Sequence, residues 1–298
     1  MRRSRSLQES DPSAGEAGSM KGQSAGLDGL ESIADWPGGR RSAGWLTADG
    51  RQATAGDLDG PYRLASVTKL LSTMAILVAV EDGTVDLDEP AGPPGSTVRL
   101  LLCHASGLPF QGQRPIAKPG QRRIYGNTAF EALGAFIEER TGLPFGEYAL
   151  EAVCAPLGLA DTTWGRSPGH GARSTVPDLL RLCGELLHPG RVIATATLTE
   201  ATTVQLPLLR GVVPGVGRFN PNPWGLGFEI RGDKAPHWMP PNGSPRTFGH
   251  FGQSGAMLWV DPEAGVACCA LAEEPFGPWA LEAWPALGDT VLALVRDA

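Results

Sequence analysis

The chain predicts a mixed fold of α/β composition and α+β type, in which a long helical insertion divides an antiparallel sheet along the sequence. Short strand patterns with turn signals lie near both ends of the chain, and the region between them spaces its apolar residues as helices do. Strands that follow one another through short turns pair antiparallel. We therefore expect one domain over 28–298, with the sheet in 28–84 and 205–298 and the helical insertion in 85–204.

Length and charge exclude several classes of function. A chain of 298 residues with 42% hydrophobic residues is long enough to bury a sizeable core. Its formal net charge of -7 and the absence of a basic cluster past the first residues predict no nucleic-acid partner. No segment reaches the roughly 18 apolar residues of a membrane span, so no membrane partner is predicted.

The first residues read as a polar tail. Residues 1–27 are rich in Ser, Gly, Glu and Arg, which predicts disorder, and Met20 is an alternative start of translation to Met1. The arginines at the start are not followed by the apolar run of an export signal, so we expect a cytoplasmic location.

The five cysteines do not suggest a metal site. They are odd in number, scattered and without zinc-type spacing, which predicts reduced core residues and neither metal nor cofactor. Cys268 and Cys269 are neighbours in an apolar run and would point to opposite sides of a strand.

The first part of the chain predicts a hairpin and then a long helix. Residues 41–56 alternate as two strands around a turn at Asp49–Gly50. A helix is expected from Ser66 to Glu81 because its apolar residues recur at helical spacing, and Gly83 stands where a helix ends.

The insertion and the last part of the chain follow from the same signals. Thr128 and Glu131 have the spacing of a capping box and would open a helix to Arg140 that Gly142 stops. Further helices are expected at 97–104, 144–154, 175–188 and 195–204; a loop at 205–223; strands at 224–230, 247–252, 255–260 and 266–272; and a closing helix from 278 with a break near Pro285.

Ser66 and Lys69 are the first candidate catalytic residues. Residues three apart lie on one helix face, so the two side chains can approach each other at the start of the predicted helix. A serine hydroxyl becomes nucleophilic when a base takes its proton, and a desolvated amine can be that base. The alternative is a solvated Ser and Lys on a helix surface.

Two further elements carry polar residues at positions that suit a site. Tyr125 and Asn127 lie in the turn before the helix at Thr128, where Tyr can shuttle a proton if a cation lowers its pKa and Asn can bind an acyl oxygen or a lysine. The alternative is that Asn127 caps the helix and Tyr125 only packs. His250 lies in a glycine-rich strand that suggests close approach of a ligand.

In this order, the three elements resemble the signature of the serine β-lactamase and penicillin-binding-protein superfamily: S-x-x-K, then Tyr/Ser-x-Asn, then Lys/His-x-Gly. The segments LLCHASGLP at 101–109, LGLADTT at 157–163 and WGLGF at 224–228 also resemble that superfamily, within which the chain is most similar to class C β-lactamase-like esterases and peptidases. The resemblance implies a five-stranded antiparallel sheet with flanking helices, an all-helical subdomain, and an active site between them.

The resemblance also implies roles. Ser66 would be the nucleophile, while Lys69 and Tyr125 handle protons. The backbone N–H groups of Ser66 and Gln253 would form the oxyanion hole. Substrate contacts would come from four residues: Asn127, His250, Gly252 and Gln253.

One departure from the signature bears on the substrate. The third motif has His250 where a Lys would offer a permanent cation, so we expect a weaker, pH-dependent attraction for a substrate carboxylate. This favours a small-molecule ester or amide over a β-lactam or a D-alanyl peptide. A β-lactamase or D-amino-acid peptidase, and a binding or sensing protein without turnover, remain the alternatives, and the oligomeric state is open. His104 and Ser106 are interpreted as structural.

Overall fold

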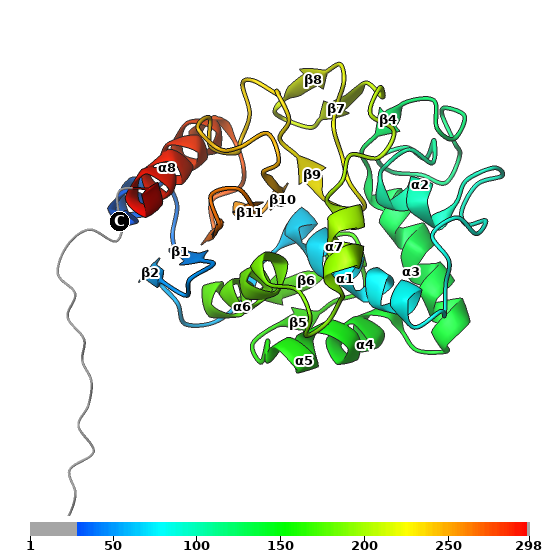
Figure 1. The fold of residues 1–298 in the computed structure, drawn as a ribbon, viewed down its shortest axis with the longest axis horizontal. Coiled ribbons are helices and arrows are strands. Elements are labelled where there is room, and N and C mark those ends of the chain that lie inside the picture. Colours follow the sequence, from blue (N-terminus) through cyan, green and yellow to red (C-terminus); the bar gives the residue numbers. More distant parts are fainter. Residues whose placement is uncertain (1–28, 297–298) are drawn as a thin grey trace, which may run out of the picture.

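A six-stranded antiparallel sheet lies at the centre of the computed structural model, which describes residues 29–296 (Figure 1). Its order is β2-β1-β12-β11-β10-β9. The strands are β1 (Arg41–Thr47), β2 (Gln52–Gly56), β9 (Glu229–Ile230), β10 (Phe248–Gly252), β11 (Ala256–Asp261) and β12 (Val266–Ala272). The five longer strands match the sheet that the resemblance implies, and two-residue β9 adds an edge. The predicted tail at 1–27 and the choice between Met1 and Met20 lie outside the described residues.

The sheet joins the two ends of the chain, as the strand pattern predicts. Strand β1 pairs antiparallel with β12, from Arg41 opposite Ala272 to Thr47 opposite Val266. The strand expected at 224–230 is short because Gly227 has a positive φ and the backbone N–H of Gly225 bonds to Phe228 O, which forms a turn.

Both faces of the sheet are buried. One face packs against α8 (Pro278–Arg296) and the 3-10 turn Glu31–Asp35, and the other against α1 (Thr68–Glu81) and α6 (Val176–Leu187) (Figure 1). Cys268 belongs to the first core and Cys269 to the second, which confirms that they point to opposite sides of the strand. Both are free thiols.

Helix α1 lies inside the molecule. Every residue from Thr68 to Leu77 is buried, so the helix is enclosed on all sides by the sheet and by the helical region. The predicted helix at 66–81 is thus confirmed, except that its first turn, Ala65–Val67, is a 3-10 turn.

The remaining helices overlap the predicted ranges, except α5, which lies just after the helix expected at 144–154. They are α2 (Val98–Leu102), α3 (Asn127–Thr141), α4 (Phe145–Ala149) with the π-helical turn Leu150–Cys154, α5 (Ala155–Leu157), α6 and α7 (Thr195–Ala201). Short strands accompany them in two three-stranded sheets: β3 (Tyr62–Arg63), β6 (Ala172–Ser174) and β5 (Thr163–Trp164) in one, and β4 (Arg123–Ile124), β7 (Gly211–Val213) and β8 (Gly217–Phe219) in the other.

Three local predictions are wrong. The segment expected as a loop at 205–223 contains β7 and β8, which pair as an antiparallel hairpin. The capping box does not form, because Gly126 is the N-cap of α3 and the Glu131 carboxylate instead accepts a hydrogen bond from the hydroxyl of Ser167. Helix α8 runs through Pro285 without a break, since the buried side chains Trp284 and Leu287 hold it against the sheet.

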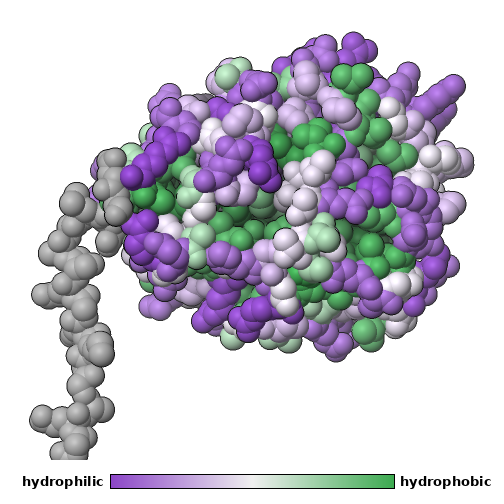
Figure 2. All heavy atoms as spheres, in the orientation of Figure 1, coloured by the Kyte–Doolittle hydropathy of each residue, from purple (hydrophilic) through white to green (hydrophobic). Residues whose placement is uncertain are grey.

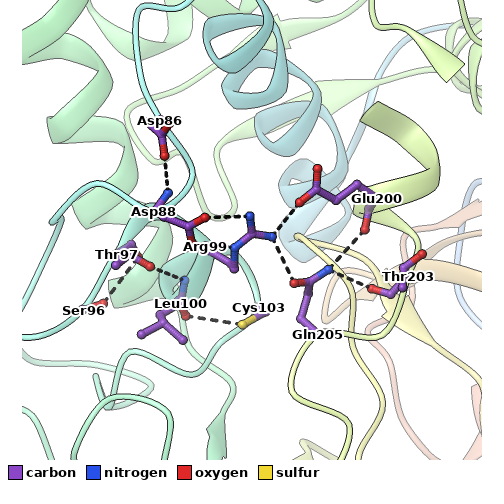
Figure 3. Close-up of polar contacts among 10 residues, drawn as sticks. All are labelled: Asp86, Asp88, Ser96, Thr97, Arg99, Leu100, Cys103, Glu200, Thr203 and Gln205. Carbon is purple, nitrogen blue, oxygen red and sulfur yellow. Dashed lines mark hydrogen bonds and ion pairs between the residues drawn. The ribbon is translucent and has the colours of Figure 1, made fainter. Parts of the chain in front are cut away.

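Arg99 ties the helical region together (Figure 3). Its guanidinium forms a two-pronged pair with Asp88, at 2.8 and 3.0 Å, and also donates to Glu200 Oε1 at 2.8 Å and Gln205 Oε1 at 3.2 Å. The network connects α2 to the end of α7 and to the loop that follows it.

In the orientation of Figure 1, the visible face of the molecule has hydrophobic residues gathered in its middle and hydrophilic residues around the rim (Figure 2). Among residues 29–296, no helix combines the length and the hydropathy needed to cross a membrane.

Candidate active site

Ser66 occupies the turn that leads into α1. It is partly exposed, whereas the helix that follows is buried. Ala65 before it has a φ of 45°, a left-handed conformation that a residue with a side chain seldom adopts. Strained backbone of this kind persists where the surrounding structure fixes it, often at functional sites. The local fold therefore presents the Ser66 hydroxyl at the open end of a rigid helix.

Lys69 lies beneath Ser66 and is fully buried. Its Nζ lies 3.1 Å from Ser66 Oγ, 2.7 Å from Asn127 Oδ1 and 2.8 Å from the backbone oxygen of Gly169. Burial lowers the pKa of Lys69 to about 7, although the nearby Glu131 carboxylate acts in the opposite direction. A substantial fraction of the amine is therefore neutral at neutral pH and can accept the Ser66 proton.

Tyr125 contacts Ser66 from the opposite side. Its hydroxyl donates a hydrogen bond to Ser66 Oγ at 2.6 Å. Its ring is held by His104, at 4.7 Å between centroids, and by Trp224 and His250 at 5.9 and 5.6 Å. Burial raises the pKa of Tyr125, so the condition given for proton shuttling, a pKa lowered by a nearby cation, is not met. Tyr125 keeps its proton and serves as a donor.

Asn127 is the first residue of α3 and does not cap it. Its Oδ1 accepts the hydrogen bond from Lys69, so of the two interactions expected from the sequence the bond to lysine is present. This bond orients the amide and fixes the position of the lysine head group.

The loop at Ser167–Gly169 closes the site from behind and was not expected from the sequence. Besides Gly169, whose carbonyl accepts from Lys69, the carbonyl of Pro168 accepts from Ser72 Oγ at 2.5 Å. Ser167 shapes this loop, because its hydroxyl accepts from the backbone N–H groups of Gly169 and His170. The only signal in the sequence was a cluster of Gly and Pro, which predicts a loop but not its partner.

Strand β10 ends against the segment that carries Ser66. A Cβ added to Gly252 would lie 2.2 Å from Leu64 O and 3.1 Å from Ser66 N, so only glycine allows this approach. Gln253 follows it and is exposed. The structure thus brings Gly252 next to the Ser66 backbone, while the oxyanion hole formed by Ser66 and Gln253 stays a prediction.

His250 is buried, and its charge differs from the expectation. Its Nδ1 donates to Phe251 O at 2.7 Å, while Nε2 has no partner among the described residues. Burial, and then the charge of Lys69, lower the pKa of His250 to about 3. The ring is neutral at pH 7 and does not titrate in the usual imidazole range, so the expected pH-dependent attraction of a carboxylate is wrong.

His104 supports the site without facing a substrate. It is fully buried, has a φ of 56°, and packs its ring on Tyr125 and Phe130. Burial lowers its pKa well below the usual value, so this ring is also neutral. The structural interpretation of His104 agrees with this packing.

A cavity of about 840 Å³ adjoins Tyr125. It is lined by Phe110 and Ile116 and by residues in and beside the small sheet of β4, β7 and β8. Of the candidate site residues, Tyr125 is the one that lines this cavity.

Comparisons with known proteins agree on this architecture. A family model described as Beta-lactamase matches residues 29–290. A crystal structure from Mycobacterium bovis, described as a β-lactamase, is 49% identical with a TM-score of 0.87, covering 90% of this chain and 99% of that one.

Two curated relatives match shorter parts of the chain. The D-alanyl-D-alanine-carboxypeptidase/endopeptidase AmpH of Escherichia coli (strain K12) is 28% identical over 158 residues, or 41% of each chain. The monacolin J acid methylbutanoyltransferase of Aspergillus terreus is 31% identical over 160 residues, or 36% of this chain and 38% of that one. The matches thus span well under half the length of these relatives.

Proposed function

Because the chain belongs to the β-lactamase family of serine hydrolases, we propose that it cleaves a small ester or amide through a covalent acyl-enzyme on Ser66. The observation that carries the proposal is the buried Lys69, whose Nζ lies 3.1 Å from Ser66 Oγ and whose pKa is lowered to about 7. A nucleophile next to a base that is itself oriented by a third group is the arrangement that acyl transfer needs.

Acylation follows from these contacts. Neutral Lys69 takes the hydroxyl proton while Ser66 Oγ forms a bond to the carbonyl carbon of the substrate. The tetrahedral intermediate places negative charge on the carbonyl oxygen, where the N–H groups of Ser66 and Gln253 would donate. The bond to the leaving group then breaks, and the departing alcohol or amine takes a proton from Tyr125, which Lys69 restores.

Deacylation uses the same groups with water in place of the leaving group. Neutral Lys69 takes a proton from the water that attacks the acyl carbon. When the tetrahedral intermediate breaks down, the leaving Ser66 Oγ takes a proton from Tyr125, which Lys69 restores, and the carboxylic acid is released. Asn127 and Gly169 hold Lys69 within reach of both steps.

Because His250 is neutral, we favour an ester or amide substrate that has no carboxylate group next to His250. The second candidate is a β-lactamase or D-amino-acid peptidase, favoured by the description of the Mycobacterium bovis protein and by AmpH. The match to a methylbutanoyltransferase adds a variant of the first candidate, in which an alcohol replaces water as the acceptor. A binding protein without turnover is disfavoured because Ser66, Lys69 and Tyr125 are in contact.

The test is hydrolysis of a short 4-nitrophenyl ester, a chromogenic cephalosporin and a D-alanyl-D-alanine peptide by the wild type and by Ser66→Ala. Ser244→Ala is the matched control, because it removes a hydroxyl that bonds to Asp261 away from the site. We expect ester turnover by wild type and Ser244→Ala only. Catalytic turnover of the cephalosporin or peptide in preference to the ester would favour the second candidate, and equal ester hydrolysis by Ser66→Ala would refute the role of Ser66.

A further inference from the structure

The cavity beside Tyr125 has one wall made by an exposed sheet face. Strand β7 pairs in parallel with β4, with Ile124 opposite Val212, and antiparallel with β8, with Val212 opposite Arg218. Directly opposed residues share a face, and so do alternate residues of one strand. Arg122 and Arg210 directly precede β4 and β7, two positions before Ile124 and Val212, and together with these three strand residues they line the cavity.

This wall is strongly cationic. Arg122, Arg210 and Arg218 are exposed, and none of them forms an ion pair with a carboxylate within residues 29–296. The residues that line the cavity include no Asp or Glu. Arg122 donates a hydrogen bond to the backbone oxygen of Ile116, at 3.1 Å, which leaves its charge uncompensated. In a chain of net charge -7, three guanidinium groups without a carboxylate partner at one cavity create a local field that attracts anions.

A fourth arginine fixes the wall from behind. Arg123 is buried and donates to the backbone oxygens of Asn222, at 2.8 Å, Gln205, at 2.7 Å, and Cys103. These bonds hold β4 to the end of α2 and to the segments on either side of the β7–β8 hairpin. Arg123 is thus structural, and the three exposed arginines project from a rigid support.

The cavity is also apolar. Phe110, Ile116 and Val212 line it and are 43%, 57% and 46% exposed, which makes them three of the five large apolar residues of the described chain that are at least 39% exposed. Exposing several apolar side chains to water at one place is unfavourable in free energy, so such a patch is typical of a surface that a ligand covers. In Figure 2, hydrophobic residues lie next to strongly hydrophilic ones over the region that Figure 1 assigns to β4, β7 and β8.

We propose that this cavity binds the part of the substrate away from the reacting carbonyl, and that this part is an apolar chain or ring carrying a carboxylate held by Arg210 and Arg218, with Arg122 beside them. The inference rests on the proposed function and specifies its substrate class. Arginine suits the role because its planar fork matches a carboxylate. His250, being neutral, leaves these arginines as the cations available to the substrate.

Binding is tested first without turnover, by calorimetric titration of Ser66→Ala with octanoate and, for comparison, with the neutral 1-octanol. We expect octanoate to bind about tenfold more tightly. In the Ser66→Ala background, the double substitution Arg210→Gln and Arg218→Gln should weaken the binding of octanoate about tenfold, since each exposed charge contributes up to about fivefold. The binding of 1-octanol should change much less. Raising NaCl from about 0.05 to about 0.5 M should weaken octanoate alone.

Two controls separate charge from folding. Arg246→Gln makes the same charge change at an exposed arginine that does not line the cavity, and it should leave octanoate binding unchanged. Arg218→Lys keeps the charge and should retain most of the affinity. Octanoate binding no tighter than 1-octanol, or equal in the double variant and the Arg246→Gln control, would overturn the proposal.

Turnover then tells which part of the substrate carries the anion. A 4-nitrophenyl monoester of suberate, compared with 4-nitrophenyl octanoate, places the carboxylate on the acyl chain, and the octanoyl ester of 4-hydroxybenzoate places it on the leaving group. We expect kcat/KM to rise for one of the two anionic esters and to fall in the double variant. If octanoate binds as expected but no ester is hydrolysed, the proposed function fails while the anion site stands; hydrolysis without preference for either anionic ester overturns the substrate class.

Discussion

The pH dependence of acylation follows directly from the buried lysine. With a pKa of about 7 for Lys69, the neutral fraction of its amine is about 9% at pH 6, about 50% at pH 7 and about 91% at pH 8. We therefore expect kcat/KM for a 4-nitrophenyl ester to rise about tenfold from pH 6 to pH 8 and then to level off. A lysine with its ordinary pKa of 10.5 would instead give an increase of about 100-fold over this range without a plateau.

The assay is initial rates at low substrate, with the uncatalysed hydrolysis subtracted at each pH. His250→Gln should keep the inflection near pH 7, because burial holds the pKa of His250 near 3. Lys69→Arg keeps a permanent proton and should lower kcat/KM by about 10²–10⁴-fold. A rate that keeps rising tenfold per pH unit through about pH 9 would refute the lowered pKa.

The same lowered pKa sets a trend in stability. The unfolded chain holds the Lys69 proton up to pH 10.5, whereas the folded protein loses it near pH 7, so the free energy of unfolding should rise with pH between these values. The shift corresponds to roughly 4 kcal/mol at pH 7. Lys69→Met should remove this destabilising free energy of burying the charged amine. The net gain in the free energy of unfolding should be smaller than roughly 4 kcal/mol, because Asn127 Oδ1 and Gly169 O lose a hydrogen-bond donor.

Three further substitutions test parts of the site. Tyr125→Phe removes the hydroxyl that lies 2.6 Å from Ser66 Oγ and should lower kcat/KM about 10²-fold with an unchanged circular dichroism spectrum; a near-normal rate would exclude Tyr125 from proton transfer. Gly252→Ala places a Cβ 2.2 Å from a backbone oxygen and should lower both the melting temperature and kcat; wild-type values would contradict the close approach. Glu229→Gln breaks the buried pair with Lys234, which is 2.6 Å long, and should cost about 3–5 kcal/mol in urea unfolding, so a loss below about 1 kcal/mol would show the pair to be dispensable.

Most helices and strands of the fold could be predicted from the periodic spacing of apolar residues in the sequence. Helical spacing from Val67 onward located α1, and the apolar run at Val266–Ala272 gave the bounds of β12 directly. Ser66 and Lys69 could be paired from their spacing alone, because three residues along a helix bring side chains together.

The predictions that were wrong concern contacts between segments that lie far apart in the sequence. The capping box of α3 is absent because the hydroxyl of Ser167 engages Glu131, a bond between residues 36 positions apart. The role of Gly169 could not be predicted, since its backbone carbonyl accepts a hydrogen bond from Lys69, a residue 100 positions away. Neither spacing nor composition reports such pairings.

Burial explains the remaining differences. The charge states of His250 and Tyr125 follow from the aromatic packing around them, which the sequence does not specify. The cavity wall likewise arises from strands of two or three residues, too short to give a pattern, although these strands and the residues before them bring Arg122, Arg210 and Arg218 to one cavity.

The central claim is that Ser66 becomes acylated. The most direct measurement is the intact mass of wild type and Ser66→Ala after treatment with a fluorophosphonate probe, followed by peptide mapping of the adduct. The account predicts one adduct on the wild type, located at Ser66 at the entrance to α1, and none on the variant. An unlabelled wild type, or equal labelling of both proteins, would contradict it.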